Sequence, residues 1–262
     1  MACDLNLSED QIQILNAAKS MLDTSYPVSR RRKRSADDLG EIAAFGLYGI
    51  ALPLDGETGY SLVEEALLHV MLGRHAVSTG ALAAALAVRL SAGAGRGEVA
   101  AAIASGSTAV CAGISAGETA LLFERGDSPL ALLFDGREIA LLDLSGLATQ
   151  PVEALGHGIP VQRLGTAVAK EIARSGADEL IAIADLLVSA QLLGVAEATR
   201  DLAVAYANMR HQFGQPIGGF QSIKHHCANM AVLAEMASAQ LDMAAIALRD
   251  GKEDASFQVA SL

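Results

Sequence analysis

Two long segments of the chain carry apolar residues at helical spacing. Between Ala177 and Arg210 these residues recur at steps of three, four or seven, and a second run follows from Ile223 to Leu248. This spacing is typical of helices that bury one face. The first helix would reach about 50 Å at the usual rise per residue. The sequence therefore predicts two long helices joined by the Gly- and Pro-rich stretch between them.

The N-terminal part of the chain has the same helical character in shorter pieces. Ser8-Glu9-Asp10-Gln11 is a capping box, which predicts the start of a helix. The segment from Leu62 to Leu90 is expected to be helical with a break near Ser78–Gly80, and a short helix follows through Ile103. We therefore expect a first helical domain over residues 1–108.

Residues 109–165 alternate short apolar runs with turn formers. The dipeptide Asp135-Gly136 separates two of these runs, which predicts a hairpin with a type I′ turn. A small β domain is expected here, followed by a second helical domain over 166–262. The predicted fold is mainly α with a small β domain, in α–β–α order. Four runs are predicted to be strands: Val110–Ile114, Ala120–Phe123, Leu130–Phe134 and Arg137–Leu142.

The composition suits closely packed helices. Hydrophobic residues make up 52% of the chain, whereas aromatic residues make up 4% and tryptophan is absent, so small aliphatic side chains must build the core. The formal charge of −11 would repel a phosphate backbone, and we therefore expect no nucleic-acid partner. A nucleotide cofactor held by one or two local arginines is compatible with that charge.

Neither a membrane segment nor an export signal is expected. The apolar stretch from Ala76 to Ala92 contains Arg89, and the stretch from Leu180 to Ala196 is interrupted by Asp185 and Gln191. The N-terminal residues lack the positive start and the apolar run of a secretory signal. These patterns predict a soluble, cytoplasmic protein.

Two local clusters resemble binding sites, but the rest of the chain argues against that interpretation. His225-His226-Cys227 suggests a metal site, but neighbouring residues of a helix point about 100° apart and cannot converge on one ion. No metal is therefore expected. The basic run Arg30 to Arg34 suits a nuclear-import or phosphate-binding patch, or else a solvated connector between helices. In so acidic a chain the connector is the favoured interpretation.

The most informative stretch is Arg210-His-Gln-Phe-Gly-Gln-Pro-Ile-Gly-Gly-Phe-Gln221, between the two long helices. A guanidinium offers a rigid fork of donors to phosphate oxygens. The ring of Phe213 can cover a flat heterocycle, and the amide of Gln221 can both donate and accept. A structural interpretation also exists, because a helix pair needs a turn and a basic residue complements a helix C-terminus.

This stretch resembles the acyl-CoA dehydrogenase family of flavoproteins. In that family Arg-x-Gln-Phe-Gly-x-Pro-Ile-x-x-Phe-Gln lies in the C-terminal helical domain and reaches the FAD of a neighbouring subunit. The resemblance implies that Arg210 pairs with the pyrophosphate of FAD and that Phe213 packs on its adenosine half. It also implies a hydrogen bond from Gln221 to the dinucleotide, while Gln212 and Ile217 occupy matching positions.

The resemblance further implies an activity and partners. Family members desaturate an acyl-CoA thioester between its α and β carbons: a carboxylate takes the α-proton and FAD accepts the β-hydride. A homo- or hetero-oligomer is implied, with a dimer of dimers as the expected form. An electron-transfer flavoprotein is the candidate electron acceptor.

The sequence departs from the family pattern in two places. Cys111 to Glu118 stands where active members carry a Thr-Glu-Pro-x-x-Gly-Ser-Asp-like stretch, and lacks both its proline and its Gly-Ser-Asp end. The helical bundle is truncated in comparison, since Phe257 to Leu262 resembles only the start of a third helix. The catalytic residue is therefore unassigned, with Glu179 as one candidate. The chain is either a subunit of such a dehydrogenase, including a degenerate one, or a non-catalytic helical assembly partner.

Overall fold

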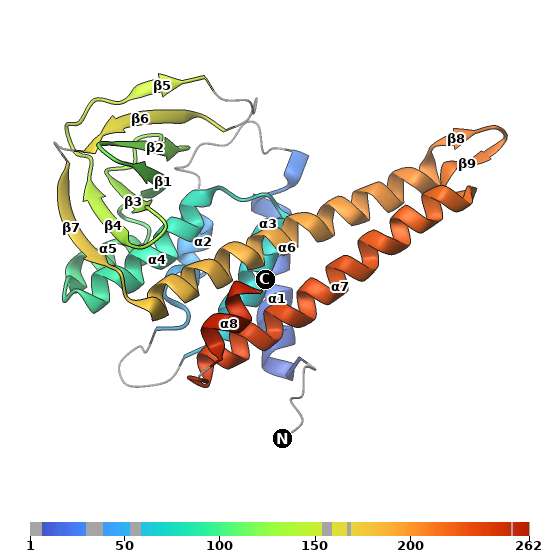
Figure 1. Cartoon of the computed structure of the whole chain (residues 1–262), viewed down its shortest axis with the longest axis horizontal. Coiled ribbons are helices and arrows are strands. Elements are labelled where there is room, and N and C mark those ends of the chain that lie inside the picture. The colour runs from blue at the N-terminus through green and yellow to red at the C-terminus, as the bar shows by residue number, and fades with distance from the viewer. Residues whose placement is uncertain are drawn as a thin grey trace.

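A computed structural model describes residues 7–29, 39–52, 59–153, 159–166, 169–252 and 254–261. Along the chain a seven-stranded sheet follows an N-terminal group of helices and precedes a long C-terminal helix pair; in space it lies at one side of the molecule, beside α4 (Thr79–Gly93) and α5 (Gly97–Ala104) (Figure 1). The predicted α–β–α order is therefore confirmed. The basic run Arg30 to Arg34 lies outside the described residues.

The N-terminal helices start where the sequence predicted. The Ser8 capping box is present: the Gln11 backbone N–H donates to Ser8 Oγ (3.2 Å), and the Ser8 backbone N–H donates to Gln11 Oε1 (2.9 Å). The predicted helical break appears between Arg74 and Thr79. The elements are α1 (Glu9–Ser25), α2 (Gly40–Ala44), the 3-10 turn η2 (Leu47–Gly49), α3 (Leu62–Arg74), α4 (Thr79–Gly93) and α5 (Gly97–Ala104).

The sheet is larger than the sequence predicted. The four predicted strands are present, but β5, β6 and β7 were not foreseen, and β7 carries the sheet past residue 165 to Ser175. The strand order is β5-β6-β2-β1-β3-β4-β7, with β1 and β3 parallel and the other pairs antiparallel. The strands are β1 (Val110–Ala116), β2 (Thr119–Phe123), β3 (Leu130–Phe134), β4 (Ile139–Asp143), β5 (Gln150–Val152), β6 (Val161–Gly165) and β7 (Lys170–Ser175).

The turn between β3 and β4 corrects the type I′ prediction. Phe134 pairs with Ile139, so four residues form the loop, and only Gly136 has a positive φ, of 92°. A carboxylate oxygen of Asp135 accepts the backbone N–H groups of Arg137 and Glu138, both at 2.9 Å. The loop therefore combines one left-handed residue, Gly136, with hydrogen bonds to the Asp135 side chain, instead of two left-handed residues.

The C-terminal part is dominated by two long helices, as predicted. In Figure 1 they extend away from the sheet and carry a small hairpin at their far end. By length and composition alone α6 and α7 would be long and apolar enough to cross a membrane, but α6 packs against α3 and α7 within the protein. The elements are α6 (Asp178–Met209), β8 (His211–Gln212), β9 (Gln215–Pro216), the 3-10 turn η4 (Ile217–Gly219), α7 (Gln221–Arg249) and α8 (Ala255–Ala260).

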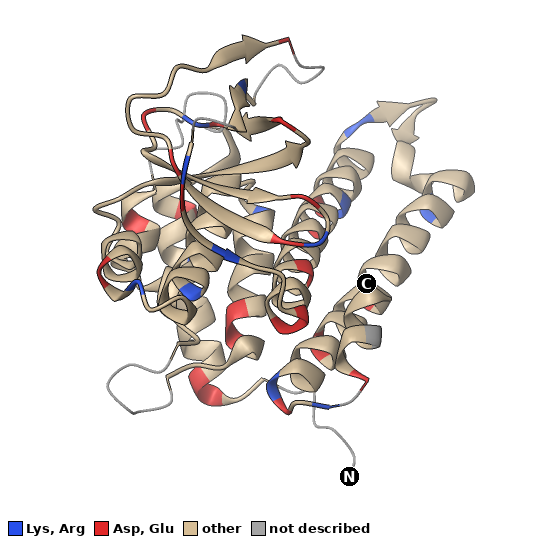
Figure 2. Cartoon of the chain, turned by 60° about the vertical axis from the view of Figure 1, so that its left-hand side comes forward, with Lys and Arg blue, Asp and Glu red and all other residues tan. Residues whose placement is uncertain are grey.

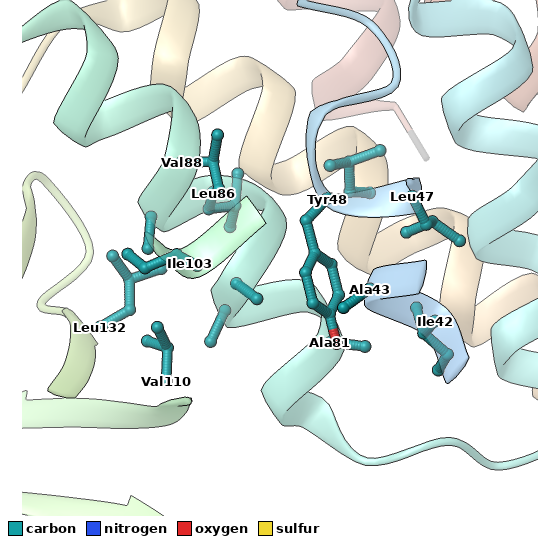
Figure 3. Packing of buried hydrophobic residues seen from close by; sticks show 14 of the residues in the cluster. Ile42, Ala43, Leu47, Tyr48, Ala81, Leu86, Val88, Ile103, Val110 and Leu132 are labelled. Carbon is teal, nitrogen blue, oxygen red and sulfur yellow. The ribbon is translucent and has the colours of Figure 1, made fainter. Parts of the chain in front are cut away.

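The main hydrophobic core lies where α4 meets the sheet and the short N-terminal helices. In Figure 3, the Tyr48 ring reaches towards Ala81 on α4, while Val110 and Leu132 come from the sheet. Along α4 the side chains of Ala81, Ala83, Ala84, Ala85 and Ala87 are buried. These small side chains let the helix lie close to its neighbours, as the composition implied.

The closest helix contact joins α3 and α6. A Cβ atom added at Gly73 would overlap the carbonyl oxygen of Gln191, and one added at Gly194 would overlap the carbonyl oxygen of Val70. The two backbones therefore touch, and only glycine fits at either position. This contact sets how α6 is placed against the N-terminal helices.

A buried polar group lies beside that contact. Arg89 of α4 forms an ion pair with Glu65 of α3, and Gln191 of α6 contacts the His69 ring at 3.2 Å. The Glu65 and His69 side chains are buried. Burial, with the nearby Arg89 cation, lowers the pKa of His69 to about 3, so the ring is neutral at pH 7.

We predict that Gly194→Ala destabilises the protein by about 3 kcal/mol, because the added methyl forces α3 and α6 apart. Gly93→Ala is the matched control, since Gly93 also lies in a helix but a Cβ there meets nothing within 4 Å. That control should leave stability unchanged or raise it by up to about 1 kcal/mol. Urea unfolding measures both; equal effects of the two substitutions would contradict the close contact.

We predict that His69 makes the protein acid-sensitive. Its folded-state pKa, about 3, lies below the ordinary 6.5, so between these values the unfolded chain binds the proton and stability falls as pH falls. From pH 7 to pH 5 the native protein should lose about 2 kcal/mol more than His69→Gln, whose side chain stays neutral. Comparing the urea midpoints of the two proteins removes the contribution of the other titratable groups. Identical pH dependence of the two midpoints would refute the low pKa of His69.

Candidate functional site

The hairpin at the tip of the helix pair has an unusual backbone. His211 pairs with Pro216 and Gln212 with Gln215, which leaves Phe213 and Gly214 as a two-residue turn. Both turn residues have positive φ, 52° at Phe213 and 78° at Gly214, as a type I′ turn requires. A bulky aromatic residue in this conformation is strained. The local structure holds Phe213 in place despite that cost.

The turn presents Phe213 to solvent. Its side chain is 93% exposed, and its ring makes only an edge contact with Phe220, at 6.2 Å between centroids. An apolar ring that projects from a strained turn does not stabilise its own protomer by burial. The position is therefore built to present the ring outward.

The structure brings the five predicted residues together at this tip. Arg210 follows the end of α6, and its carbonyl oxygen accepts the Ile217 backbone N–H at 2.8 Å. Gln212 donates from Nε2 to the carbonyl oxygen of His211 at 2.8 Å. Gln221 is the first residue of α7. The side chains of Arg210, Gln212 and Gln221 are exposed, whereas Ile217 is half-buried.

The tip is the basic pole of an acidic chain. No aspartate or glutamate occurs from Leu202 to Ala234, whereas that stretch contains Arg210, Lys224 and three histidines. Figure 2 shows the same distribution, with blue and no red around the hairpin. No ion pair engages Arg210 within the part of the chain that the structure describes. Its guanidinium is therefore available to an anion.

The start of α7 adds donors to that pole. Its N-cap, Phe220, provides no side-chain hydrogen bond, and its first turn contains no acidic residue. The first backbone N–H groups of a helix have no partners within it and attract anions. The tip thus combines a guanidinium, helix N–H groups, an exposed ring and amide side chains. Among the described residues no cluster suits a metal ion, and His225-His226-Cys227 forms no such cluster.

A second candidate site is a large apolar cavity at the other end of α6. Its volume is about 900 Å³, and it lies between α4, the sheet and α6. The sheet wall includes Ala112, Gly113 and Ile114 of β1. The α6 wall consists of Ala184, Asp185, Val188, Gln191, Leu192 and Val195.

Asp185 is the one acidic residue among the described residues that line this cavity. Asp185 is exposed, and partial burial of its carboxyl group raises its pKa above the ordinary value. Neither a hydrogen bond nor an ion pair to Asp185 occurs within the described ranges. Asp185 could be noticed in the sequence, because it interrupts an otherwise apolar helical stretch. The sequence alone did not show that this position borders a cavity.

A buried carboxylate fixes the sheet against α4 at this cavity. Glu124, which follows β2, accepts a hydrogen bond from Ser78 Oγ (2.7 Å) and one from the Thr79 backbone N–H (3.3 Å). Glu124 has a positive φ of 49° and is buried. It caps the start of α4 from the sheet, so it joins two walls of the cavity.

Glu179 does not belong to this cavity. It is exposed in the first turn of α6, where an acid complements the helix dipole. It borders a separate depression of about 310 Å³ together with Arg89 and Arg174. Its position gives no support to a catalytic role. The tip and the cavity are also far apart, because the 25 residues from Asp185 to Arg210 span about 38 Å of helix.

Residues 177–262 match the family model for the acyl-CoA dehydrogenase C-terminal domain. The acyl-CoA dehydrogenase FadE34 of Mycobacterium tuberculosis (strain ATCC 25618 / H37Rv) is 31% identical over 80% of this chain and 31% of its own length. The acyl-CoA dehydrogenase IpdE2 of Mycolicibacterium smegmatis is 28% identical over 74% of this chain and 60% of its own. The chain therefore spans less than two thirds of either relative.

Solved structures share the fold across nearly the whole chain. The Tcur3481-Tcur3483 steroid ACAD G363A variant has a TM-score of 0.74 and 20% identity, over 96% of this chain and 81% of its own. Butyryl-CoA dehydrogenase from Megasphaera elsdenii has a TM-score of 0.74 and 18% identity, over 99% of this chain and 84% of its own. With the matched C-terminal domain and the relatives above, this shared fold confirms the resemblance, and the chain belongs to the acyl-CoA dehydrogenase family.

Proposed function

We propose that this chain is a subunit of an FAD-dependent acyl-CoA dehydrogenase and that its hairpin tip completes the FAD site of a neighbouring subunit. The observation that carries the proposal is the exposed Phe213 in a left-handed turn beside the unpaired Arg210. Strain at such a position indicates function. The tip lies far along α6 from the cavity of its own protomer, so it can serve a nucleotide only in an adjoining one.

The residues at the tip fit a flavin dinucleotide. Arg210 and the uncapped start of α7 suit a pyrophosphate, Phe213 suits the face of an adenosine, and the amides of Gln212 and Gln221 suit polar edges. Ile217 would support the turn from beneath. FAD, when bound, supplies a hydride acceptor. A glutaryl-CoA dehydrogenase of the same fold from Mycobacterium smegmatis is described in complex with FADH2.

The cavity is proposed to take the acyl group. Its walls are almost entirely apolar, and about 900 Å³ lies in the range that encloses a sizeable organic ligand. One neighbour in fold is named as a steroid acyl-CoA dehydrogenase. A bulky acyl group, carried on coenzyme A, is therefore the proposed substrate class.

An oligomer is proposed from the outer faces of the helix pair. Leu192, Leu202, Met209, Leu233 and Met236 are each more than 60% exposed on α6 and α7. Exposed apolar surface of this extent indicates an interaction face. A homo- or hetero-oligomer, in the form of a dimer of dimers, would cover it and bring tip and cofactor together. An electron-transfer flavoprotein as acceptor and a cytoplasmic location are further parts of the proposal.

A second candidate function is a non-catalytic assembly partner that keeps the fold. The observation that favours it is the sheet wall of the cavity, where Ala112, Gly113 and Ile114 offer no side-chain hydrogen bonds to a flavin. In that case the hairpin tip would still serve a neighbour, but the chain's own cavity would hold no cofactor.

We predict that Arg210→Ala weakens FAD retention at least 10-fold, because a charge-assisted pair with phosphate contributes about 1.5–3 kcal/mol. Arg210→Lys should restore only part of it, since an ammonium lacks the fork. Arg249→Ala, at the opposite end of α7, is the matched control and should change nothing. Flavin absorbance after gel filtration gives the readout, and equal retention by all variants would refute the proposed FAD contact.

We also predict that Phe213→Gly separates stability from cofactor binding. Glycine adopts positive φ without strain, so the turn should gain about 1 kcal/mol and thermal stability should not fall. FAD retention should nevertheless decrease, because the ring is gone. Phe220→Leu, which alters the neighbouring ring without touching the turn, serves as the comparison. Unchanged flavin retention in Phe213→Gly would show that the exposed ring has another purpose.

A further inference from the structure

The cavity between α4, the sheet and α6 is apolar except for a few side chains. Among the described residues that line it, the polar ones are Thr79, Asp185 and Gln191. A polar group placed in an apolar cavity fixes the orientation of any ligand that can pair with it. Of these three side chains, Gln191 is held in place from two sides.

The backbone of Gln191 is fixed by the contact between α3 and α6. Gly73 lies directly against the carbonyl oxygen of Gln191, so that not even a Cβ atom would fit between them. A residue in so close a contact cannot shift unless the two helices separate. The side chain of Gln191 therefore leaves α6 from a fixed point on the cavity wall.

A buried histidine fixes the side-chain amide of Gln191. Gln191 Nε2 lies 3.2 Å from His69 Nδ1. An amide nitrogen can only donate, so the ring nitrogen accepts, as one nitrogen of a neutral imidazole does. The His69 ring is buried, and this burial keeps it neutral at pH 7. The amide of Gln191 is therefore oriented with its nitrogen towards the core.

This arrangement leaves the amide oxygen of Gln191 uncommitted. Within the described ranges no hydrogen bond reaches Oε1, and this atom keeps accessible surface, unlike the buried hydroxyl oxygen of Thr79. Gln191 is half-buried and borders the cavity. An amide oxygen accepts hydrogen bonds and cannot donate them. An acceptor that is held in one orientation among apolar walls favours a ligand that brings a donor to it.

We propose that Gln191, held by His69, is a specificity-determining residue that selects an acyl group with a hydroxyl on its apolar body. This inference rests on the proposed function, which places a bulky acyl group in this cavity. The hydroxyl donates to Gln191 Oε1, while the rest of the acyl group contacts the apolar walls. A charged ammonium would lose its hydration there without a charge on Gln191 to compensate, so a neutral hydroxyl is the donor that fits.

The experiment compares four CoA thioesters that share one bulky, rigid skeleton. Cholanoyl-CoA has no hydroxyl, whereas lithocholoyl-, chenodeoxycholoyl- and deoxycholoyl-CoA carry hydroxyls at different ring positions. Isothermal titration calorimetry on the purified full chain, without an electron acceptor, gives the dissociation constants, and the flavin content of each sample is recorded. The variants are Gln191→Leu, which removes the amide, and Thr79→Val, a matched control that removes the other uncharged polar side chain of the cavity.

We expect at least one hydroxylated thioester to bind the native protein about 10-fold more tightly than cholanoyl-CoA, as one additional buried hydrogen bond does. Gln191→Leu should lose this preference and bind cholanoyl-CoA as the native protein does, because its cavity remains apolar. Thr79→Val should keep the preference. Gln191→Met, whose unbranched side chain adapts to its surroundings, replaces the leucine variant if that fails to fold.

Three outcomes would overturn the inference. They are equal affinity of the native protein for all four thioesters, no binding of any of them, and a hydroxyl preference that survives in the Gln191 variants. Failure of the proposed function has a different signature. A hydroxyl preference that depends on Gln191, in a chain that retains no flavin, would keep the selectivity and remove the dehydrogenase.

Discussion

The backbone contact between α3 and α6 fixes the rest of the molecule. With glycine at positions 73 and 194, each helix lies against a carbonyl group of the other, which leaves little freedom for either to rotate. Because this contact fixes α6 about its axis, Asp185 borders the cavity, and Gln191 borders it while also contacting the buried His69 ring. The same contact directs the far end of α6, with its hairpin, away from the sheet (Figure 1).

Helix α6 thus contributes to both the cavity and the hairpin tip, which cannot meet within one protomer. Asp185 and Arg210 are separated by about 38 Å along α6, and a helix held by a packed core does not bend over that distance. The cavity supplies apolar volume but little polarity, while the tip supplies charge and donors but no enclosure. Each lacks what the other offers. The proposed function therefore requires an assembly in which the tip of one protomer reaches the cavity of another.

Local patterns predicted what depends on local sequence. The helical stripes gave α6 and α7, the capping box gave the start of α1, and the Arg210–Gln221 motif indicated the tip. Features set by distant residues escaped prediction. Strand β7 is polar on most of its length and exists because β4 pairs with it, and the Asp135 loop forms through a side chain. Asp185 stood out in the sequence, but its cavity is built from three segments far apart in the chain.

The apolar outer faces of α6 and α7 explain why both helices resemble membrane spans by composition. A helix that packs on a core along one side and on a partner along the other is apolar all round, and so is a helix in lipid. The charges separate the two cases. Asp185 and Asp242 have no ion pair within the described ranges, and burial raises the pKa of each. In hydrocarbon such carboxylates would cost several kcal/mol apiece. Within a folded protein a partly buried carboxylate can still meet water, and the packing of α6 against α3 and α7 accounts for much of the apolar composition of these two helices.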